Sequence, residues 1–370
     1  MKIAIVHDYL NQPGGAERVV ATLHRMYPDA PIFTTIHDPA VVGEPLASAD
    51  VRVSWMQRLP GWRKHFKAYL PLYPLAVRSF DLRGFDLIIS SSSAFAKGVR
   101  VPKGAVHVCY CYTPMRFAWS FDAYVGRSSL SALSRVAASV VMGPMRRWDV
   151  STARHVNRFI AISNEIAKRI RDTYDRDSDV IFPPVDVERF HPRPNPEDFF
   201  LIVSRLNSYK RIDLAVAACT ARGLPLIVVG DGPDRPQLQA AAGPTVRFVG
   251  RLPDADVTDL FARCRALILP GAEDFGLTPL EANAAGRPVV AFARAGALDT
   301  VRPGVTGVLF DEPTADSLAS ALDVLVAHEW DQDVLRAHAE TFSEETFAGR
   351  FRQAVAREIA RHSFGNSAME

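Results

Sequence analysis

The stretch ALILPGAEDFGLTPLEANAAGRPVVAF, residues 266–292, places a helical pattern between two short apolar runs. The runs ALILPG and PVVAF each predict a buried strand. Between them, Thr278 suits the position that caps a helix N-terminus, Pro279 suits the first helical position, and Gly286 suits the end of the helix. Strand, loop, helix and strand in this order form the repeating unit of a mainly parallel α/β sheet.

Two glutamates in this stretch can be interpreted in two ways. Glu273 lies on the loop after the first strand, and ligands of open α/β sheets bind outside the carboxyl ends of the strands. Glu281 comes three residues after Thr278, which is the spacing of a capping box. Either Glu281 only closes the helix N-terminus, or both carboxylates belong to a binding site.

The same alternation extends in both directions along the chain. In the second half, FFLIVSR, PLIVVG, VRFVG and TGVLF predict further strands separated by helix-compatible segments. In the first half, KIAIVH, FDLIIS, AVHVCYC and RFIAIS predict a second parallel sheet. Between the two series lies the proline-rich stretch FPPVDVERFHPRPNPEDF, residues 182–199, which predicts an interdomain linker.

The length of 370 residues favours two domains, because it is too long for one ordinary core. We expect an α/β protein with two Rossmann-like, doubly wound domains, residues 1–185 and 186–343, that face each other across a cleft. The segment FAGRFRQAVAREIARH near the C-terminus predicts an amphipathic helix, with Phe, Val and Ile on one face and Arg on the other.

Composition narrows the possible locations and cofactors. The chain opens with KIAIVHDY and contains no apolar run near the ~20 residues that span a bilayer, so we expect no signal peptide and a cytoplasmic protein. Four cysteines without zinc-site spacing are expected to be reduced structural thiols. They are Cys109, Cys111, Cys219 and Cys264. The ten histidines form no metal-binding motif, so we expect no metal site and no cofactor.

Glycines or cations follow the first predicted strand of each domain. In HDYLNQPGGAERVV, Gly14 and Gly15 precede a helix that begins near Ala16, and amides at a helix N-terminus suit phosphate. A tight Gly-Gly turn is the alternative. In SRLNSYKR, Arg205 and Lys210 offer a planar fork and a point charge that suit a diphosphate. Solvated surface charge is the alternative here.

The stretch WMQRLPGWRKHFKAYLPLYPLAVR, residues 55–78, mixes aromatic and basic residues and contains no acid. Such a mixture suits the surface of an anionic membrane, although an ordinary charged domain edge is an equal alternative. The residues expected to contact the membrane are Trp55, Arg58, Trp62, Arg63, Lys64, Phe66 and Lys67. Nucleic acid is a poorer partner, because no recognised binding module accompanies the charge.

The second domain resembles the retaining glycosyltransferases of family 4, which have the GT-B fold. The matching segments, in the family's order and spacing, are SRLNSYKR, VGDGPDRPQL, RFVGRLPDADVTDLFARCRALILPGAEDFGLTPLEANAAGRPVVAF and GVTGVLF. In the first domain, HDYLNQPGGAERV and YCYTPMRFAW are similar to bacterial mannosyltransferases of O-antigen and exopolysaccharide assembly. The resemblance implies that the C-terminal helix and tail, residues 344–370, pack back on the first domain.

The resemblance also implies roles for particular residues. Glu273 would lie beside the sugar and diphosphate of a nucleotide-sugar donor, Arg205 and Lys210 would hold the diphosphate, and Glu281 would accept hydrogen bonds from the ribose. Other donor-side residues would be Gly15, Arg251, Phe275, Gly276 and Leu277. Acceptor-side residues would be Gly14, Tyr112, Thr113 and Arg116. His7, at the end of the first strand, is either a catalytic polar group facing the acceptor or a structural histidine.

Two positions depart from the family pattern. Tyr112 and Thr113 stand where many members carry an active-site histidine. The family's GGxxE is AGALD in this chain, with Asp299 in place of Glu. Catalytic detail of the first domain is therefore the least defined part of the resemblance.

The implied reaction is transfer of mannose from GDP-mannose to a lipid-linked or oligosaccharide acceptor, with retention and without metal. Same-face attack fits this family, with the departing phosphate oxygen taking the acceptor's proton. We expect the enzyme to lie peripherally on the inner face of the cell membrane. Three alternatives remain: a UDP-sugar donor, a nucleotide-sugar epimerase, and a non-catalytic partner subunit that binds nucleotide or membrane.

Overall fold

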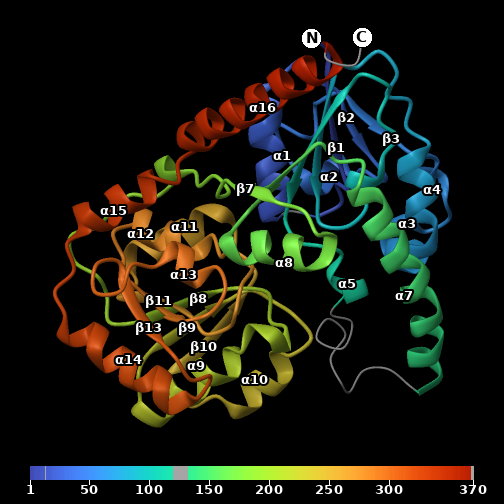
Figure 1. Ribbon diagram of the computed structural model, residues 1–370. Coiled ribbons are helices and arrows are strands. Elements are labelled where there is room, and N and C mark those ends of the chain that lie inside the picture. Colours follow the sequence, from blue (N-terminus) through green and yellow to red (C-terminus); the bar gives the residue numbers. More distant parts are fainter. Residues whose placement is uncertain (13, 120–131, 368–370) are drawn as a thin grey trace. The chain divides into compact units, whose positions relative to one another are not determined.

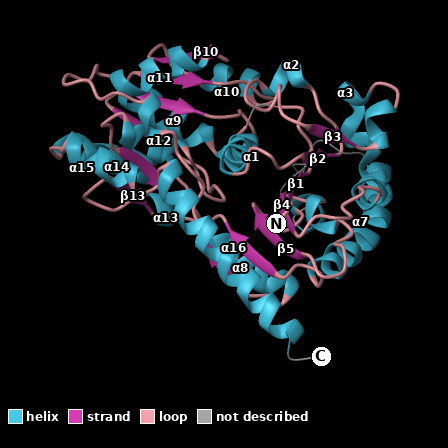
Figure 2. Cartoon of the chain, turned by 90° about the horizontal axis from the view of Figure 1, so that it is seen from above, coloured by secondary structure: helices cyan, strands magenta, loops and turns pink. Residues whose placement is uncertain are grey.

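The computed structural model describes residues 1–12, 14–119 and 132–367 (Figure 1). The chain divides into two compact units. The first comprises Met1–Phe182 together with Phe347–Glu370, and the second comprises Pro183–Thr346. Helices surround the strands of each unit (Figure 2).

The first unit contains a seven-stranded sheet with the order β3-β2-β1-β4-β5-β6-β7. Its strands are β1 (Ile3–His7), β2 (Ile32–Thr34), β3 (Val51–Val53), β4 (Leu87–Ser92), β5 (Val106–Cys111), β6 (Arg158–Ala161) and β7 (Ser178–Val180). All neighbouring strands pair in parallel. The strand order reverses between β1 and β4, where His7 lies opposite Ser91.

The remaining elements of the first unit are α-helices and 3₁₀ helices, the latter labelled η, and the last of them, α16, is the C-terminal helix. They are α1 (Gly15–Met26), α2 (Pro39–Val42), η1 (Trp55–Arg58), α3 (Trp62–His65), η2 (Phe66–Leu72), α4 (Tyr73–Arg78), η3 (Ala96–Gly98), α5 (Arg116–Trp119), α7 (Ala132–Ala153), α8 (Asn164–Tyr174) and α16 (Glu344–Ser367). On α16, Phe347 and Phe351 lie 5.5 and 6.1 Å from the Tyr110 ring of β5, centroid to centroid. These contacts confirm that the C-terminal helix packs on the first domain.

The second unit contains a six-stranded parallel sheet with the order β10-β9-β8-β11-β12-β13. Its strands are β8 (Phe200–Val203), β9 (Leu226–Val229), β10 (Val246–Gly250), β11 (Ala266–Leu269), β12 (Val289–Phe292) and β13 (Gly307–Phe310). This is the strand order of the doubly wound dinucleotide-binding fold. The fold class predicted from the sequence is confirmed.

The helices and turns of the second unit are η4 (Val187–Arg189), η5 (Ser208–Lys210), α9 (Ile212–Arg222), α10 (Arg235–Ala241), α11 (Asp254–Arg263), α12 (Thr278–Ala284), α13 (Ala297–Thr300), α14 (Ala315–Ala327) and α15 (Gln332–Glu340). Apolar side chains from β8, β9, β11 and β12 pack with α9 and α14 to form the core. Parallel strands that are covered on both faces need apolar side chains on both sides, and this is why the strands of this sheet were recognisable as apolar runs in the sequence.

The predicted start of α12 is wrong by one residue. Leu277, not Thr278, is the N-cap, and no side chain caps this helix. Gly276 has φ +84°, so the chain already turns there, and Leu277 follows with helical dihedrals. Glu281 is therefore the fourth helical residue, and the capping box expected with Thr278 does not form. The end of the helix just before Gly286 is as predicted.

Candidate functional site

The strand order of the second sheet reverses between β8 and β11, which pair side by side. The loops after these two strands lead the chain in opposite directions, and such a point is where open α/β sheets bind ligands. The loop after β8 carries Arg205 and Lys210, and the loop after β11 carries Glu273. The fold thus gathers three predicted site residues at one edge of one sheet.

Lys210 and Glu273 contact each other directly at this edge. The ammonium Nζ of Lys210 donates a hydrogen bond to Oε1 of Glu273. Their side chains remain 14% and 19% exposed, so both are accessible to a ligand. Gly271 permits this contact, because a Cβ at that position would lie 2.6 Å from the carbonyl oxygen of Lys210. The sequence did not identify this glycine as part of the site.

A third loop supports the one that carries Arg205. The backbone N–H of Leu206 donates to the carbonyl oxygen of Asp231 at 3.1 Å, and the N–H of Asp234 donates to the carbonyl oxygen of Leu206 at 3.1 Å. Asp231 and Asp234 belong to the GDGPD segment after β9. Arg205 itself is exposed. These backbone bonds fix the loop from which the guanidinium projects.

The loop of Glu273 is held from the other side by the AGALD segment. The N–H of Gly296 donates to the carbonyl oxygen of Glu273 at 2.9 Å, and Glu273 forms an isolated parallel bridge with Ala295. Asp299, which replaces the family's glutamate, lies half-buried on α13. The segment that departs from the family pattern therefore still supports the position of Glu273.

The remaining donor-side residues differ in their surroundings. Glu281 lies on α12 and is 7% exposed. Phe275 is buried, and its ring packs 6.2 Å from that of Phe342, so it supports the loop from within the core. Gly276 and Leu277 form the turn into α12 and are half-buried.

Arg251 is exposed and follows β10, which β9 separates from β8 in the sheet. Among the described residues, no hydrogen bond or ion pair joins Arg251 to Lys210 or Glu273. The second unit therefore brings together the Lys210–Glu273 pair and leaves Arg251 at a separate position along the same edge.

In the first unit, the strand order reverses between β1 and β4, and a polar chain lies at that point. His7 Nδ1 is 3.0 Å from the carbonyl oxygen of Ser91 and 3.1 Å from its Oγ. Ser91 Oγ is 2.8 Å from the Tyr112 hydroxyl, which donates to the carbonyl oxygen of Ala16 at 3.1 Å. This chain connects β1, β4, β5 and the first turn of α1, and Ser91 was not predicted from the sequence.

The hydrogen-bond directions in this chain assign the tautomer of His7. Because Tyr112 uses its proton on Ala16, Ser91 donates to Tyr112, and His7 Nδ1 carries the proton that it donates to Ser91. Burial, as the largest cause, raises the pKa of Tyr112 well above its ordinary value and keeps the hydroxyl protonated. In neutral His7 the lone pair is then on Nε2. His7 as a whole residue is 2% exposed.

Asp8, directly after β1, is a second residue that the sequence did not reveal. Its carboxylate is 1% exposed and accepts five hydrogen bonds of 2.6–2.9 Å. The donors are the Ser93 hydroxyl and the backbone N–H groups of Ser93, Ala94, Phe95 and Ala96. The carboxylate thereby fastens the loop after β4 to the end of β1.

The other predicted acceptor-side residues lie before α1 or in the segment that follows Tyr112. Gly14 is the N-cap of α1 in an extended conformation, and the exposed Gly15 is the first helical residue, so no side chain caps the first-turn amides. Thr113 donates from Oγ1 to the carbonyl oxygen of Pro114 at 3.0 Å. Arg116 is half-buried at the start of α5.

The basic aromatic stretch of residues 55–78 forms η1, α3, η2 and α4. Trp62 is only 9% exposed and packs in the core, so its assignment as a membrane-contacting residue is wrong. Phe66 is half-buried against the same core. Arg63 is exposed but pairs with Asp38 at 2.8 Å, an acid outside the stretch. The exposed members are Trp55, Arg58, Arg63, Lys64 and Lys67.

The structure describes the ranges 1–12, 14–119 and 132–367. They contain no helix long and apolar enough to cross a membrane, and no cluster of three or more His, Cys, Asp or Glu side chains with the geometry to bind a metal. All four cysteines are buried and unpaired, as expected.

Comparisons with curated proteins give partial matches. The GDP-mannose-dependent alpha-mannosyltransferase of Mycolicibacterium smegmatis is 36% identical over 127 residues, or 34% of this chain and 33% of that protein. The D-inositol 3-phosphate glycosyltransferase of Mycobacterium avium is 29% identical over 59% of this chain and 56% of its own length. The glycogen synthase of Pseudomonas fluorescens is 30% identical over 68% of this chain and 50% of its own length. The chain thus matches between 33% and 56% of these relatives' length.

Solved structures extend the similarity over nearly the whole chain. Anabaena Alr3699/HepE, solved in complex with UDP, has a TM-score of 0.69 at 18% identity and covers 96% of this chain and 100% of its own. The sucrose-phosphate synthase of Thermosynechococcus elongatus has a TM-score of 0.74 at 18% identity, with coverage of 98% and 100%. At this identity the likeness establishes the fold.

Family models match both halves of the chain. Residues 13–189 match Glycosyltransferase Family 4, and residues 186–348 match Glycosyl transferases group 1. The boundary between the two matches falls in the proline-rich linker. The chain therefore has the GT-B fold, with a first half that matches the family 4 glycosyltransferase model and a second half that matches the group 1 glycosyl transferase model.

Proposed function

We propose that this protein is a retaining glycosyltransferase that transfers mannose from GDP-mannose to a lipid-linked or oligosaccharide acceptor in O-antigen or exopolysaccharide assembly. The observation that carries the proposal is the contact between Lys210 and Glu273 where the strand order of the second sheet reverses. The choice of GDP-mannose is supported by the 36% identity to a GDP-mannose-dependent enzyme over a third of the chain.

The donor's diphosphate fits the cations after β8. The Lys210 ammonium has three N–H donors, so its bond to Glu273 leaves two for phosphate oxygens. Arg205, on the same loop, adds a planar guanidinium that suits two phosphate oxygens at once. Fixed cations at this position stabilise the dianion that forms when the bond from sugar to diphosphate breaks.

Two carboxylates would serve the rest of the donor. Glu273, already oriented by Lys210, would lie beside the sugar. Glu281, on α12 directly after the loop that carries Glu273, would accept hydrogen bonds from the ribose hydroxyls. The amides of Gly276 and Leu277, at the turn into α12, would contribute donors to the same substrate.

The proposed chemistry retains the anomeric configuration. The bond between the anomeric carbon and the phosphate oxygen breaks, and the acceptor oxygen bonds to the same face of that carbon. The acceptor's proton passes to the departing phosphate oxygen. Because Lys210 and Arg205 supply the positive charge, we propose that the reaction needs no metal. His7, with its lone pair on Nε2, would orient the acceptor hydroxyl.

We also propose that the enzyme acts peripherally at the inner face of an anionic membrane. The support is the exposed set Trp55, Arg58, Lys64 and Lys67 on η1, α3 and η2. Each basic residue near an anionic surface contributes ~1 kcal/mol of attraction. This location would bring the enzyme to a lipid-linked acceptor.

A transfer assay tests the function against its alternatives. The protein is incubated in excess EDTA with GDP-mannose or UDP-glucose, and with or without a polyprenyl-diphosphate-linked sugar or a short mannose oligosaccharide. We expect GDP release only when acceptor is present, and NMR should show a retained anomeric centre. Preference for UDP-glucose would identify a UDP-sugar enzyme, and a rearranged nucleotide sugar without acceptor would identify an epimerase. Nucleotide binding without turnover under any condition would indicate a non-catalytic subunit.

A further inference from the structure

The segment Tyr112–Trp119 of the first unit leads from the end of β5 through α5. It contains the residues assigned to the acceptor side, including Thr113 and Arg116. Its first residue is fixed by the bonds of Tyr112 to Ser91 and Ala16. In its middle, Met115 is fully buried in the core of the unit. Arg116 follows Met115 and lies between it and the other end of the segment.

That other end is held by α7. The indole Nε1 of Trp119 donates to Oδ2 of Asp149 at 2.7 Å. Arg146 Nε donates to the carbonyl oxygen of Ala118 at 2.6 Å, and its guanidinium lies 5.7 Å from the centre of the Trp119 ring. Trp119 is 39% exposed, yet its donor reaches a fully buried carboxylate. Packing alone would hold a partly exposed indole ring only loosely, whereas the hydrogen bond to Asp149 fixes the orientation of the Trp119 ring.

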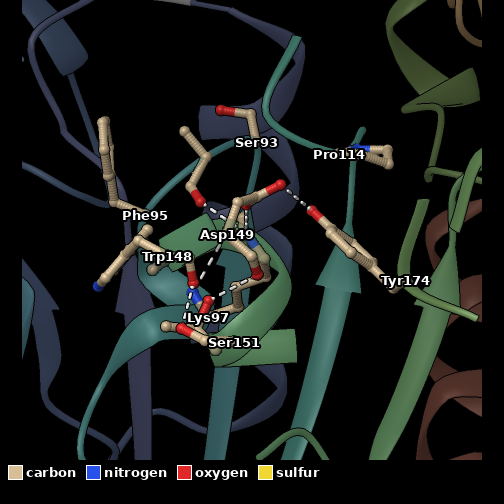
Figure 3. A network of polar contacts seen from close by, with 12 residues as sticks. Ser93, Phe95, Lys97, Pro114, Trp148, Asp149, Ser151 and Tyr174 are labelled. Carbon is tan, nitrogen blue, oxygen red and sulfur yellow. Dashed lines mark hydrogen bonds and ion pairs between the residues drawn. The ribbon is translucent and has the colours of Figure 1, made fainter. Parts of the chain in front are cut away.

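Asp149 is the centre of a buried network shown in Figure 3. Lys97 Nζ on η3 donates to its Oδ1 and also to the carbonyl oxygen of Ala94 at 2.8 Å. The Tyr174 hydroxyl at the end of α8 donates to the same Oδ2 as Trp119, at 2.8 Å. Burial first and the Asp149 charge second raise the pKa of Tyr174, so its hydroxyl remains a donor.

The network continues to the end of β1. Ala94 and the residues beside it donate their backbone N–H groups to Asp8, and Lys97 follows them on the same turn. Asp149 is therefore anchored to the point where the strand order of the first sheet reverses. The two ends of the Tyr112–Trp119 segment are fixed to the same rigid region, one through Ser91 and the other through Asp149.

We propose that Asp149 is a positioning residue for acceptor binding, which acts through Trp119 to hold the segment Tyr112–Trp119 in its binding conformation. This inference rests on the proposed function, because it assumes that Thr113 and Arg116 face the acceptor. A buried ion pair that merely stabilised the unit would not require the bond from an exposed indole.

Two matched variants test this proposal. Trp119→Phe and Tyr174→Phe each keep an aromatic ring and each remove one hydrogen bond to Asp149 Oδ2, but only Trp119 belongs to the acceptor-side segment. Replacing Asp149 itself would leave Lys97 buried without a counter-charge, so it is avoided. Both chosen variants should lower the urea midpoint, because each removes a bond to a buried charge.

The first readout is amide hydrogen exchange, which needs no turnover. The N–H groups of Ala118 and Trp119 donate to the Met115 carbonyl oxygen at 2.9 and 3.1 Å and are protected while α5 is held. In Trp119→Phe they should exchange at least about tenfold faster than in Tyr174→Phe, as expected when a segment opens locally. Equal exchange in both variants would overturn the proposed anchor.

The second readout is the KM for acceptor. Loss of a hydrogen bond to a charged group should raise it about tenfold in Trp119→Phe and leave it unchanged in Tyr174→Phe, with GDP affinity intact in both. Selective exchange without a selective rise in KM would overturn the link to acceptor binding. Absence of transfer by the wild-type protein would overturn the proposed function instead, and the exchange experiment would still decide whether Asp149 anchors the segment.

Discussion

The two sheets reverse their strand order at equivalent points but use a carboxylate there in opposite ways. In the first unit, Asp8 is buried and its two oxygens accept five hydrogen bonds from the loop after β4. In the second unit, Glu273 remains partly exposed and bonds to Lys210, which is itself partly exposed. The Asp8 carboxylate is saturated by donors from the loop after β4, whereas the Glu273 carboxylate remains accessible to a ligand.

This difference indicates that equivalent positions of the two sheets can have different roles: one carboxylate holds a loop in place, and the other is available to bind a substrate. A carboxylate saturated by backbone donors fixes a loop and cannot also bind substrate without losing those bonds. The Lys210 and Glu273 side chains keep 14% and 19% of their surface exposed, so this pair can contact a ligand. We therefore expect substitutions at the first point to affect folding and those at the second to affect donor chemistry.

The largest expected effect is on stability, for Asp8→Asn. The amide can accept on one side only, and its NH₂ group faces backbone donors, so the free energy of unfolding should fall by about 3 kcal/mol or more. Urea denaturation followed by tryptophan fluorescence measures this, because four of the five tryptophans, Trp55, Trp62, Trp119 and Trp148, lie in the first unit. Asp50→Asn, an exposed carboxylate paired with Arg52, should leave the midpoint unchanged. Equal midpoints for both variants would refute the supporting role of Asp8.

The next effect is on turnover, for Glu273→Gln. Loss of a preorganised charge beside the reacting sugar should lower turnover at least about 100-fold, while GDP affinity and the urea midpoint stay near the wild-type values. The neighbouring Asp274→Asn serves as the control and should retain turnover. If Glu273→Gln instead unfolded the protein or retained its activity, the contrast with Asp8 would fail.

A smaller effect is expected on nucleotide affinity, for Glu281→Gln. Glutamine keeps the size of the side chain on α12, but the loss of charge-assisted bonds to the ribose should weaken GDP binding about tenfold. Pyrophosphate lacks the ribose and should bind both proteins equally. Calorimetric titration with the two ligands separates these outcomes, and a parallel loss for GDP and pyrophosphate would argue against a ribose contact.

The smallest effect concerns the membrane patch in the first unit. Lys64→Glu should weaken sedimentation with vesicles of anionic phospholipid about fivefold, given ~1 kcal/mol per basic residue near the surface. Lys168→Glu, an exposed cation on α8 of the same unit, is the matched control and should bind as the wild type does. Equal loss in both variants would indicate nonspecific charge attraction. Trp62 is not used, because its burial would confound binding with folding.

The sequence predicted those features that depend on local patterns. Continuous apolar runs predicted ten strands, whereas β2, β3 and β7 have three residues each and no comparable run. The start of α12 was missed because Gly276, rather than Thr278, sets where the chain turns into the helix. Strand order depends on pairing between segments that are distant in the sequence. Local patterns therefore could not predict the contact between Lys210 and Glu273.

The supporting residues of the first unit could not be predicted for the same reason. Asp8 and its donors lie more than 80 residues apart in the chain, and no local pattern connects them. Ser91 appears in the sequence as one of several serines at the end of a strand. Trp62 is buried by core side chains from other elements of the first unit. The local mixture of aromatic and basic residues could not show this, and the sequence therefore predicted that Trp62 is exposed.

Titration of GDP and pyrophosphate against Lys210→Met and Arg211→Met tests whether the point between β8 and β11 is the donor site. The two cations are adjacent, but Lys210 pairs with Glu273, whereas Arg211 pairs with Asp213 on the surface. If Lys210 holds the diphosphate, both ligands should bind about tenfold more weakly to Lys210→Met and almost unchanged to Arg211→Met. Equal losses in the two variants, or undiminished binding to Lys210→Met, would contradict a donor site at this edge.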